Sequence, residues 1–207
     1  MKFRIHPILL PVFLFFMVVG GVSLYAMILF SLVFHELGHV VAAKKTGMKI
    51  RSCTILPYGG ELQIVNRQLA TKQQRLITAL GGPVATAVLL IVGSFVEFPG
   101  REQFVQIQWI LLSVNLLPFL PLDGGQVISV LVETKKNKYI SRSYFTLYSI
   151  VAAIALSVYL IGFLPDSLPY VLLTSFLVLQ NVVTYRFRKY EQIFEQMASG
   201  AKQTTIN

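Results

Sequence analysis

Charged residues are scarce in this chain of 207 residues. Lys, Arg, Asp and Glu make up 13% of it, hydrophobic residues make up 55%, and the mean hydropathy is +0.66. A soluble domain carries about 25% charged residues, so these charges are too few to cover a water-facing globule of this size. The apolar content also excludes intrinsic disorder. Cysteine occurs once, at Cys53, which excludes a disulfide framework or a multi-cysteine zinc site.

Acidic residues are rarer than basic residues in this chain. Nine Asp and Glu residues stand against 18 Lys and Arg residues, which gives a net charge of +9. In a soluble protein this excess would suggest nucleic-acid binding. The basic residues of this chain lie between apolar runs, where they are better interpreted as a signal of membrane topology. We therefore expect a lipid bilayer as the surrounding partner and no direct binding of nucleic acid.

Long apolar runs dominate the chain. A transmembrane helix needs roughly 20 mostly apolar residues. Six runs come close to this length: 7–20, 23–43, 76–96, 104–121, 144–164 and 168–185. They predict an all-α polytopic membrane protein. Its six transmembrane helices would occupy 1–185, and a cytoplasmic linker helix and tail would occupy 186–207.

The distribution of basic residues supports this topology. With the amino terminus in the cytoplasm and six crossings, only Arg101 of the 18 Lys and Arg residues falls on the outer side. Cytoplasmic loops of membrane proteins carry the excess of Lys and Arg. We therefore expect a multi-pass integral membrane protein with both termini in the cytoplasm.

The predicted inner segment between the second and third spans has a pattern of its own. Two β-prone runs, 50–56 and 61–65, flank Pro57-Tyr58-Gly59-Gly60, which indicates a hairpin. We expect a small β-hairpin on the cytoplasmic side. Two interpretations stay open. The hairpin is either a connector at the membrane surface or an exposed edge, carrying Ile64, that pairs with an extended peptide.

The second predicted span carries ionisable side chains, which are costly in lipid and usually functional. It contains His35-Glu36-Leu37-Gly38-His39, an H-E-x-x-H motif. Residues i and i+4 leave one face of a helix about a turn apart, so His35 and His39 can share one tetrahedral Zn²⁺. Glu36 projects near that face and can act as general base toward water. The alternative is a chance match to the motif with ordinary buried histidines. The cost of placing three polar side chains in hydrocarbon argues against this alternative.

A catalytic zinc site takes three protein ligands and keeps one position open, so a third ligand is needed. Cys53 lies beyond the span and His6 lies at the start of the first span, so both are poor candidates. Asp123 fits better, because prolines and glycines interrupt the apolar stretch around it. Irregular backbone at membrane depth is tolerated only where it is buried in protein or lines a water-filled cavity. The span of Asp123 and the second span both end on the cytoplasmic side, where the two motifs can meet. The alternative for Asp123 is a helix cap or turn residue beside Gly124-Gly125.

Two further features border this chemistry. Asn115 lies two helical turns before Asp123, and its amide could hydrogen-bond a substrate backbone or a developing oxyanion. An interhelical polar contact is the alternative for this amide. Gly81-Gly82-Pro83 opens the third span, where small residues favour close packing of helices.

Together these motifs resemble the site-2 protease family of intramembrane zinc metalloproteases. The matching pieces are the H-E-x-x-H motif, Gly82-Pro83 and the Asn-x-x-Pro…Leu-Asp-Gly run from Asn115 to Gly124. The resemblance implies that the two histidines of the motif and Asp123 bind zinc. It also implies that Glu36 activates water for hydrolysis of a peptide bond.

The sporulation branch of that family is the most similar in these motifs, through Leu56-Pro57-Tyr58-Gly59-Gly60 and the 115–125 run. It implies a membrane-associated protein substrate, the pro-form of a sporulation sigma factor, cleaved on the mother-cell side of the forespore membrane. It also implies membrane-protein inhibitors as partners. That branch carries a C-terminal CBS domain, which these 207 residues do not include. Truncation and natural absence both stay open.

Two other classes of function stay open. A metal transporter would spread acids or histidines through several spans as a relay, whereas this chain concentrates them at one centre. An inactive membrane scaffold would have no use for Glu36. The sequence leaves the substrate, the scissile bond, the regulators and the oligomeric state open.

Overall fold

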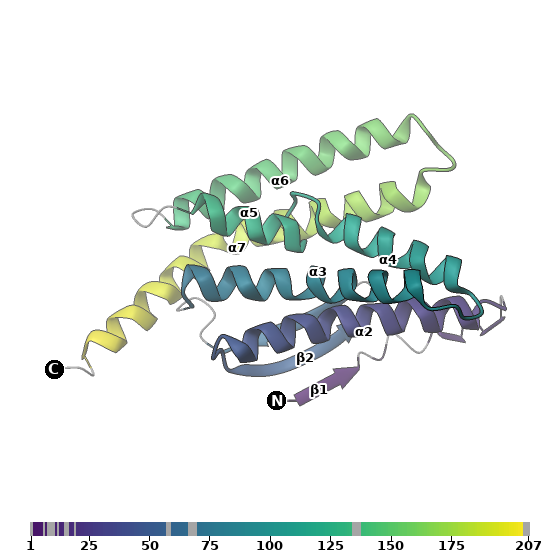
Figure 1. Ribbon diagram of the computed structural model, residues 1–207. Coiled ribbons are helices and arrows are strands. Elements are labelled where there is room, and N and C mark those ends of the chain that lie inside the picture. The colour runs from purple at the N-terminus through teal and green to yellow at the C-terminus, as the bar shows by residue number, and fades with distance from the viewer. Residues whose placement is uncertain are drawn as a thin grey trace. The chain divides into compact units, whose positions relative to one another are not determined.

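A computed structural model describes the chain as two compact units, Met1–Leu117 and Pro118–Asn207. The described residues are 2–5, 7, 11, 13–14, 17–18, 20–56, 59–65, 70–133 and 138–204. Both units are mostly helical (Figure 1), as the apolar runs of the sequence predict.

The described part of the first unit combines three helices with a small sheet. Its elements are β1 (Lys2–Ile5), α2 (Val22–Lys45), β2 (Ile50–Leu56), β3 (Gly59–Ile64), α3 (Lys72–Phe95) and α4 (Arg101–Asn115). The sheet order is β1-β2-β3, with β1 parallel to β2 and β3 antiparallel to it. The β2–β3 pair confirms the predicted hairpin, whose residues Pro57 and Tyr58 lie outside the described ranges. The sequence does not predict β1, because its partner β2 is distant in the chain and periodicity reports only local structure.

Helices α2 and α3 of the first unit pack backbone to backbone, side by side in Figure 1. A Cβ atom added to Gly38 would overlap the carbonyl oxygen of Gly81. One added to Gly81 would lie 2.6 Å from the carbonyl oxygen of Gly38. Small residues are what allow membrane helices to approach this closely. The close approach brings the side chains on either side of the crossing into direct contact.

The start of α3 is set by a capping box at Thr71. Its hydroxyl accepts a hydrogen bond from the Gln74 backbone N–H at 3.2 Å, and the Gln74 side chain accepts one from the Thr71 backbone N–H at 2.9 Å. The first turn of a helix has N–H groups without intrahelical partners, and this reciprocal pair satisfies two of them. The helix therefore begins at a defined residue, which sets the register of its buried face.

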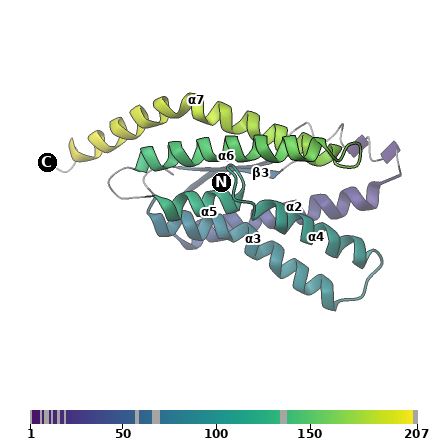
Figure 2. The same cartoon turned by 90° about the horizontal axis from the view of Figure 1, so that it is seen from above.

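The described helices of the second unit are α5 (Asp123–Val132), α6 (Lys138–Ile161) and α7 (Leu168–Thr204). Helices α6 and α7 run side by side (Figure 2) and hold the loop that leads into α5. The Ser149 hydroxyl accepts a hydrogen bond from the Leu120 N–H at 3.1 Å, and the Asn181 amide donates to the Leu120 carbonyl. Both backbone groups of this partly buried loop residue thereby have hydrogen-bond partners.

Four helices in the described part are long and apolar enough to cross a membrane: Val22–Lys45, Lys72–Phe95, Ile140–Ile161 and Leu168–Arg188. They coincide with the predicted second, third, fifth and sixth spans. The predicted first span, 7–20, falls mostly outside the described residues. The predicted fourth, 104–121, ends early, because α4 stops at Asn115 after 15 residues and the following Pro118 and Pro121 lack the N–H groups a continuing helix needs. The count of six spans stays a prediction, and the linker helix predicted after the last span continues α7.

Candidate metal centre

The buried face of α2 carries the ionisable side chains of the H-E-x-x-H motif. His35, Glu36 and His39 are 3%, 7% and 8% exposed. The spacing of four residues places the two imidazoles one turn apart on this face, and both contact α3 through ring nitrogens. Buried polar groups are costly without partners. The partners of these rings therefore decide what the site can bind.

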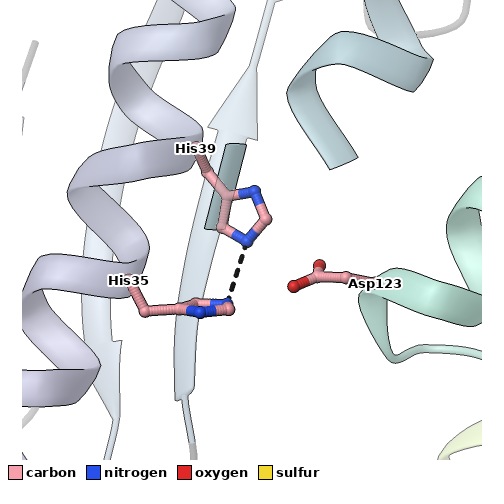
Figure 3. Close-up of side chains that lie close together, drawn as sticks. All are labelled: His35, His39 and Asp123. Atoms are coloured by element: carbon pink, nitrogen blue, oxygen red, sulfur yellow. Dashed lines mark hydrogen bonds between the residues drawn. The ribbon is translucent and has the colours of Figure 1, made fainter. Parts of the chain in front are cut away.

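The two imidazoles face each other through their Nε2 atoms, which are 3.2 Å apart (Figure 3). Zn–N bonds of about 2.0–2.1 Å in tetrahedral geometry place two nitrogen ligands about 3.3–3.4 Å apart. The observed separation is close to that edge length. Imidazole nitrogens are also among the donors that zinc takes most often. The pair therefore fits two adjacent ligand positions of a tetrahedral zinc site.

The second ring nitrogen of His39 sets its tautomer. Nδ1 lies 2.7 Å from the carbonyl oxygen of Thr78. A carbonyl can only accept, so Nδ1 carries the hydrogen and Nε2 keeps a lone pair. The Gly82 N–H also points at Nδ1, at 3.2 Å. The shorter contact to an oxygen requires a hydrogen on the nitrogen, so the carbonyl is the partner, and His39 is held in the tautomer that binds metal through Nε2.

The second ring nitrogen of His35 has a hydroxyl as its partner. Nδ1 lies 2.8 Å from Oγ1 of Thr86, a residue with no exposed surface. Thr78, Gly82 and Thr86 recur every four residues along α3 and so line the face that meets the imidazoles. The two threonines belong to none of the sequence motifs described above. Polar residues at helical spacing inside an apolar span are the signal that marks them.

Gly82 leaves the space that the two rings occupy. A Cβ atom at this position would overlap Nε2 of His39 and lie 2.5 Å from Nε2 of His35. The two glycines, which the sequence predicts to favour close helix packing, therefore have different roles. Gly81 contacts the backbone of α2, and Gly82 makes room for the ligands.

Asp123 is the first residue of α5 in the second unit and is 6% exposed. A Cβ atom at Gly125 would overlap the backbone of Phe119, so a glycine is needed for the loop to fold tightly over the start of α5. The sequence predicts Asp123 as the third metal ligand beside the two histidines, and this assignment stays a prediction.

The remaining predicted residues have other surroundings. Asn115 is the last residue of α4, and its amide donates to the Leu111 carbonyl at 2.9 Å, so its role toward substrate stays a prediction. Ile64 ends β3, which pairs with β2 alone among the described strands. His6 and the side chain of Cys53 lie outside the described part of the chain.

Known proteins are similar to this chain in sequence and in fold. The sequence profile of peptidase family M50 matches residues 23–100. Zinc metalloprotease MJ0392 of Methanocaldococcus jannaschii is 28% identical over 84% of this chain and 52% of its own length. Stage IV sporulation protein FB of Bacillus subtilis is 26% identical over 63% of this chain and 48% of its own, so the chain spans about half the length of these curated relatives. The solved structure of the site-2 protease from Methanocaldococcus jannaschii covers 88% of this chain and 90% of that chain, with a TM-score of 0.64 and 25% identity.

Proposed function

Because the chain belongs to the peptidase M50, or site-2 protease, family of zinc metalloproteases, we propose that it hydrolyses a peptide bond of a membrane-associated protein. The four apolar helices and these relatives make it an integral membrane protein. The observation that carries the proposal is the pair of buried, facing Nε2 atoms with Glu36 next in sequence to His35. Cleavage near the cytoplasmic side, with both termini in the cytoplasm, is supported by the distribution of Lys and Arg.

The third zinc ligand in this proposal is Asp123, which would complete a set of two imidazoles and one carboxylate with an open position. When bound, zinc supplies Lewis acidity and makes water nucleophilic near neutral pH. Glu36 takes the proton of the attacking water as general base and passes it to the leaving amine as general acid. Burial of Glu36 on α2 keeps bulk water from competing for its carboxylate.

The edge of β3 is the proposed binding site for the segment to be cleaved, which must be extended because a helix hides its carbonyl groups. The Val65 N–H donates to the Lys49 carbonyl at 2.8 Å, and Ile64 pairs with Ile50. Hydrogen-bonded and non-hydrogen-bonded pairs alternate in an antiparallel ladder. The N–H and C=O of Ile64 therefore point away from β2. This orientation supports main-chain pairing with an extended substrate.

Zinc content and peptide cleavage, measured on the same purified preparations, test the proposal. We expect the wild type to bind zinc and to cleave a membrane-embedded substrate. Glu36→Gln should keep the zinc while turnover falls by about 10²–10⁴-fold, since only the general base is lost. His35→Ala and Asp123→Ala should lose both zinc and activity. Zinc binding with no cleavage of any candidate substrate would favour a metal transporter or an inactive scaffold, and a wild type without zinc would end the proposal.

The β3 edge has a matched pair of variants at Ile64. Ile64→Pro removes the outward N–H without removing a hydrogen bond to β2, whereas Ile64→Ala trims the side chain and keeps the N–H. We expect the proline variant to lower kcat/KM with unchanged zinc content, and the alanine variant to keep most of the activity. Equal turnover of the proline variant and the wild type would remove this edge from the mechanism.

The finer proposal for the substrate is the pro-form of a sporulation sigma factor, with membrane-protein inhibitors as regulators and the forespore membrane as the site of action. It is supported by the similarity to stage IV sporulation protein FB of Bacillus subtilis. Co-expression with such a pro-protein should yield the shortened form with the wild type and not with Glu36→Gln. Cleavage of other membrane substrates without processing of the pro-protein would contradict this choice of substrate.

A further inference from the structure

The two metal-facing imidazoles have chemically different partners on α3. We propose that Thr86 is a positioning residue whose hydroxyl lets His35 change tautomer when zinc binds, while the Thr78 carbonyl locks His39 in one tautomer. The inference rests on the proposed zinc function. It assigns distinct tasks to two ligands that the H-E-x-x-H motif treats as equivalent.

His39 is the locked ligand. Its Nδ1 faces an acceptor at 2.7 Å that cannot donate, so this nitrogen carries the hydrogen whether or not a metal is bound. Its Nε2 therefore always presents a lone pair. The Thr78 backbone carbonyl that enforces this belongs to α3 itself and does not depend on the identity of the side chain at position 78.

Without metal, His35 must take the opposite tautomer. The Nε2 lone pair of His39 lies 3.2 Å from Nε2 of His35, and two lone pairs at that distance would repel. A hydrogen on Nε2 of His35 turns this contact into a hydrogen bond. Nδ1 of His35 then becomes an acceptor, and the Thr86 hydroxyl at 2.8 Å is placed to donate to it.

With metal, both Nε2 atoms must present lone pairs. The hydrogen of His35 then resides on Nδ1, which donates to Oγ1 of Thr86. The imidazole holds one ring hydrogen in both forms, so the exchange needs no net gain or loss of a proton. A hydroxyl serves as donor or acceptor, which a carbonyl or an amide N–H cannot do. The contact to Thr86 thus persists through the exchange, and the His35 ring keeps its orientation.

Two valine substitutions, one on α3 and one on α6, separate this role from general packing. Thr86→Val keeps the shape of the side chain and removes the partner of His35. Thr146→Val makes the same chemical change at a buried threonine of α6, whose hydroxyl donates to the Arg142 carbonyl at 2.9 Å. Thr86→Ser restores a hydroxyl at the first position. All three are made in the full chain and checked for wild-type thermal unfolding.

The first readout is zinc affinity, measured by competition with a chelator. We expect Thr86→Val to bind zinc about 10- to 100-fold more weakly, the range for loss of a partner behind a metal ligand. Thr146→Val should match the wild type, and Thr86→Ser should return most of the affinity. Equal affinities of the two valine variants, with zinc bound by the wild type, would overturn the inference alone. A wild type that binds no zinc would end the inference and the proposed function together.

The second readout is the nitrogen NMR spectrum of the imidazoles, which reports tautomers without any catalytic assay. The chain has three histidines, so few signals need assignment. In metal-free protein, His35 should carry its hydrogen on Nε2 and His39 on Nδ1. With zinc, both should carry it on Nδ1. The same tautomer for both rings in the metal-free protein would overturn the inference.

Discussion

The candidate membrane spans of the helix pairs α2–α3 and α6–α7 are of similar length and apolar content, yet the two pairs use buried polar groups differently. In α2–α3, polar groups of α3 contact imidazole rings of α2, and the backbones meet at Gly38. In α6–α7, the Ser157 hydroxyl donates to the Thr174 hydroxyl at 2.7 Å, a neutral bond that needs no further ligand. The first pair holds ionisable groups that a metal would complete. The second pair satisfies itself and supports the loop that precedes Asp123.

The comparison shows why apolar content alone does not locate a site in a membrane protein. Ionisable side chains and glycines that make room for them distinguish the first pair from the second. Substitutions in each pair should therefore fail in different ways. Substitutions in α2–α3 should lower zinc affinity or disrupt the close contact between the two helices. Substitutions in α6–α7 should lower only the stability of the protein or disturb the loop that these helices hold.

The largest effect is expected at Gly82. Gly82→Ala places a methyl group where the two Nε2 atoms lie, so the rings must move apart and zinc affinity should fall by about 100-fold or more. Gly162→Ala in the α6–α7 connection is the control, because its added Cβ meets nothing closer than 3.4 Å. Chelator competition measures both. Wild-type affinity in Gly82→Ala would show that the rings do not meet at this position.

A large loss of stability is expected at Gly38. In Gly38→Ala the added methyl group meets the backbone of α3, which cannot rotate away as a side chain can, so α2 and α3 must separate. Overpacking of this kind costs about 1–3 kcal/mol. Thermal unfolding in detergent, compared with Gly162→Ala, gives the measurement. An unchanged unfolding temperature would mean that the two backbones are farther apart than described.

A moderate effect is expected at Asn181 in the second pair. Its amide donates to the Leu120 carbonyl and, at 2.8 Å, to the Leu177 carbonyl. Asn181→Leu leaves the loop carbonyl without this donor and should cost about 1–3 kcal/mol of unfolding free energy, against about 1 kcal/mol for Ser157→Ala. A loss in Asn181→Leu no larger than in Ser157→Ala would contradict a special role in holding the loop.

The smallest effect is expected at Gln108 of α4, a polar residue beside α2 that is not part of the ligand set. Its Nε2 donates to the Ser31 hydroxyl at 2.6 Å, but its buried Oε1 has no hydrogen-bond partner. Gln108→Met removes that unsatisfied oxygen together with one hydrogen bond, so the two changes in unfolding free energy should nearly cancel, within about 1 kcal/mol. Zinc content should match the wild type. A loss of zinc would extend the metal centre to α4.

Much of this organisation can be predicted from residues that are close in sequence. The H-E-x-x-H spacing places two imidazoles on one helix face, and the β-prone runs around Gly59 indicate the hairpin, because helix and strand periods are local properties. The early end of α4 is harder to predict, since an apolar run continues past Asn115 and only the turn chemistry of Pro118 interrupts it. Strand β1 depends on a partner that no local pattern reveals.

The sequence by itself determined the membrane class and singled out the candidate ligand side chains and the glutamate beside them, because these depend on composition and on the chemistry of single motifs. Only the tertiary structure decided which atoms face the rings. The carbonyl of Thr78 and the hydroxyl of Thr86 are 39 and 51 residues away from the histidines they contact. Contacts across such separations arise from the packing of α2 on α3, where Gly82 makes room for the rings, and no local pattern specifies which nitrogen meets which oxygen.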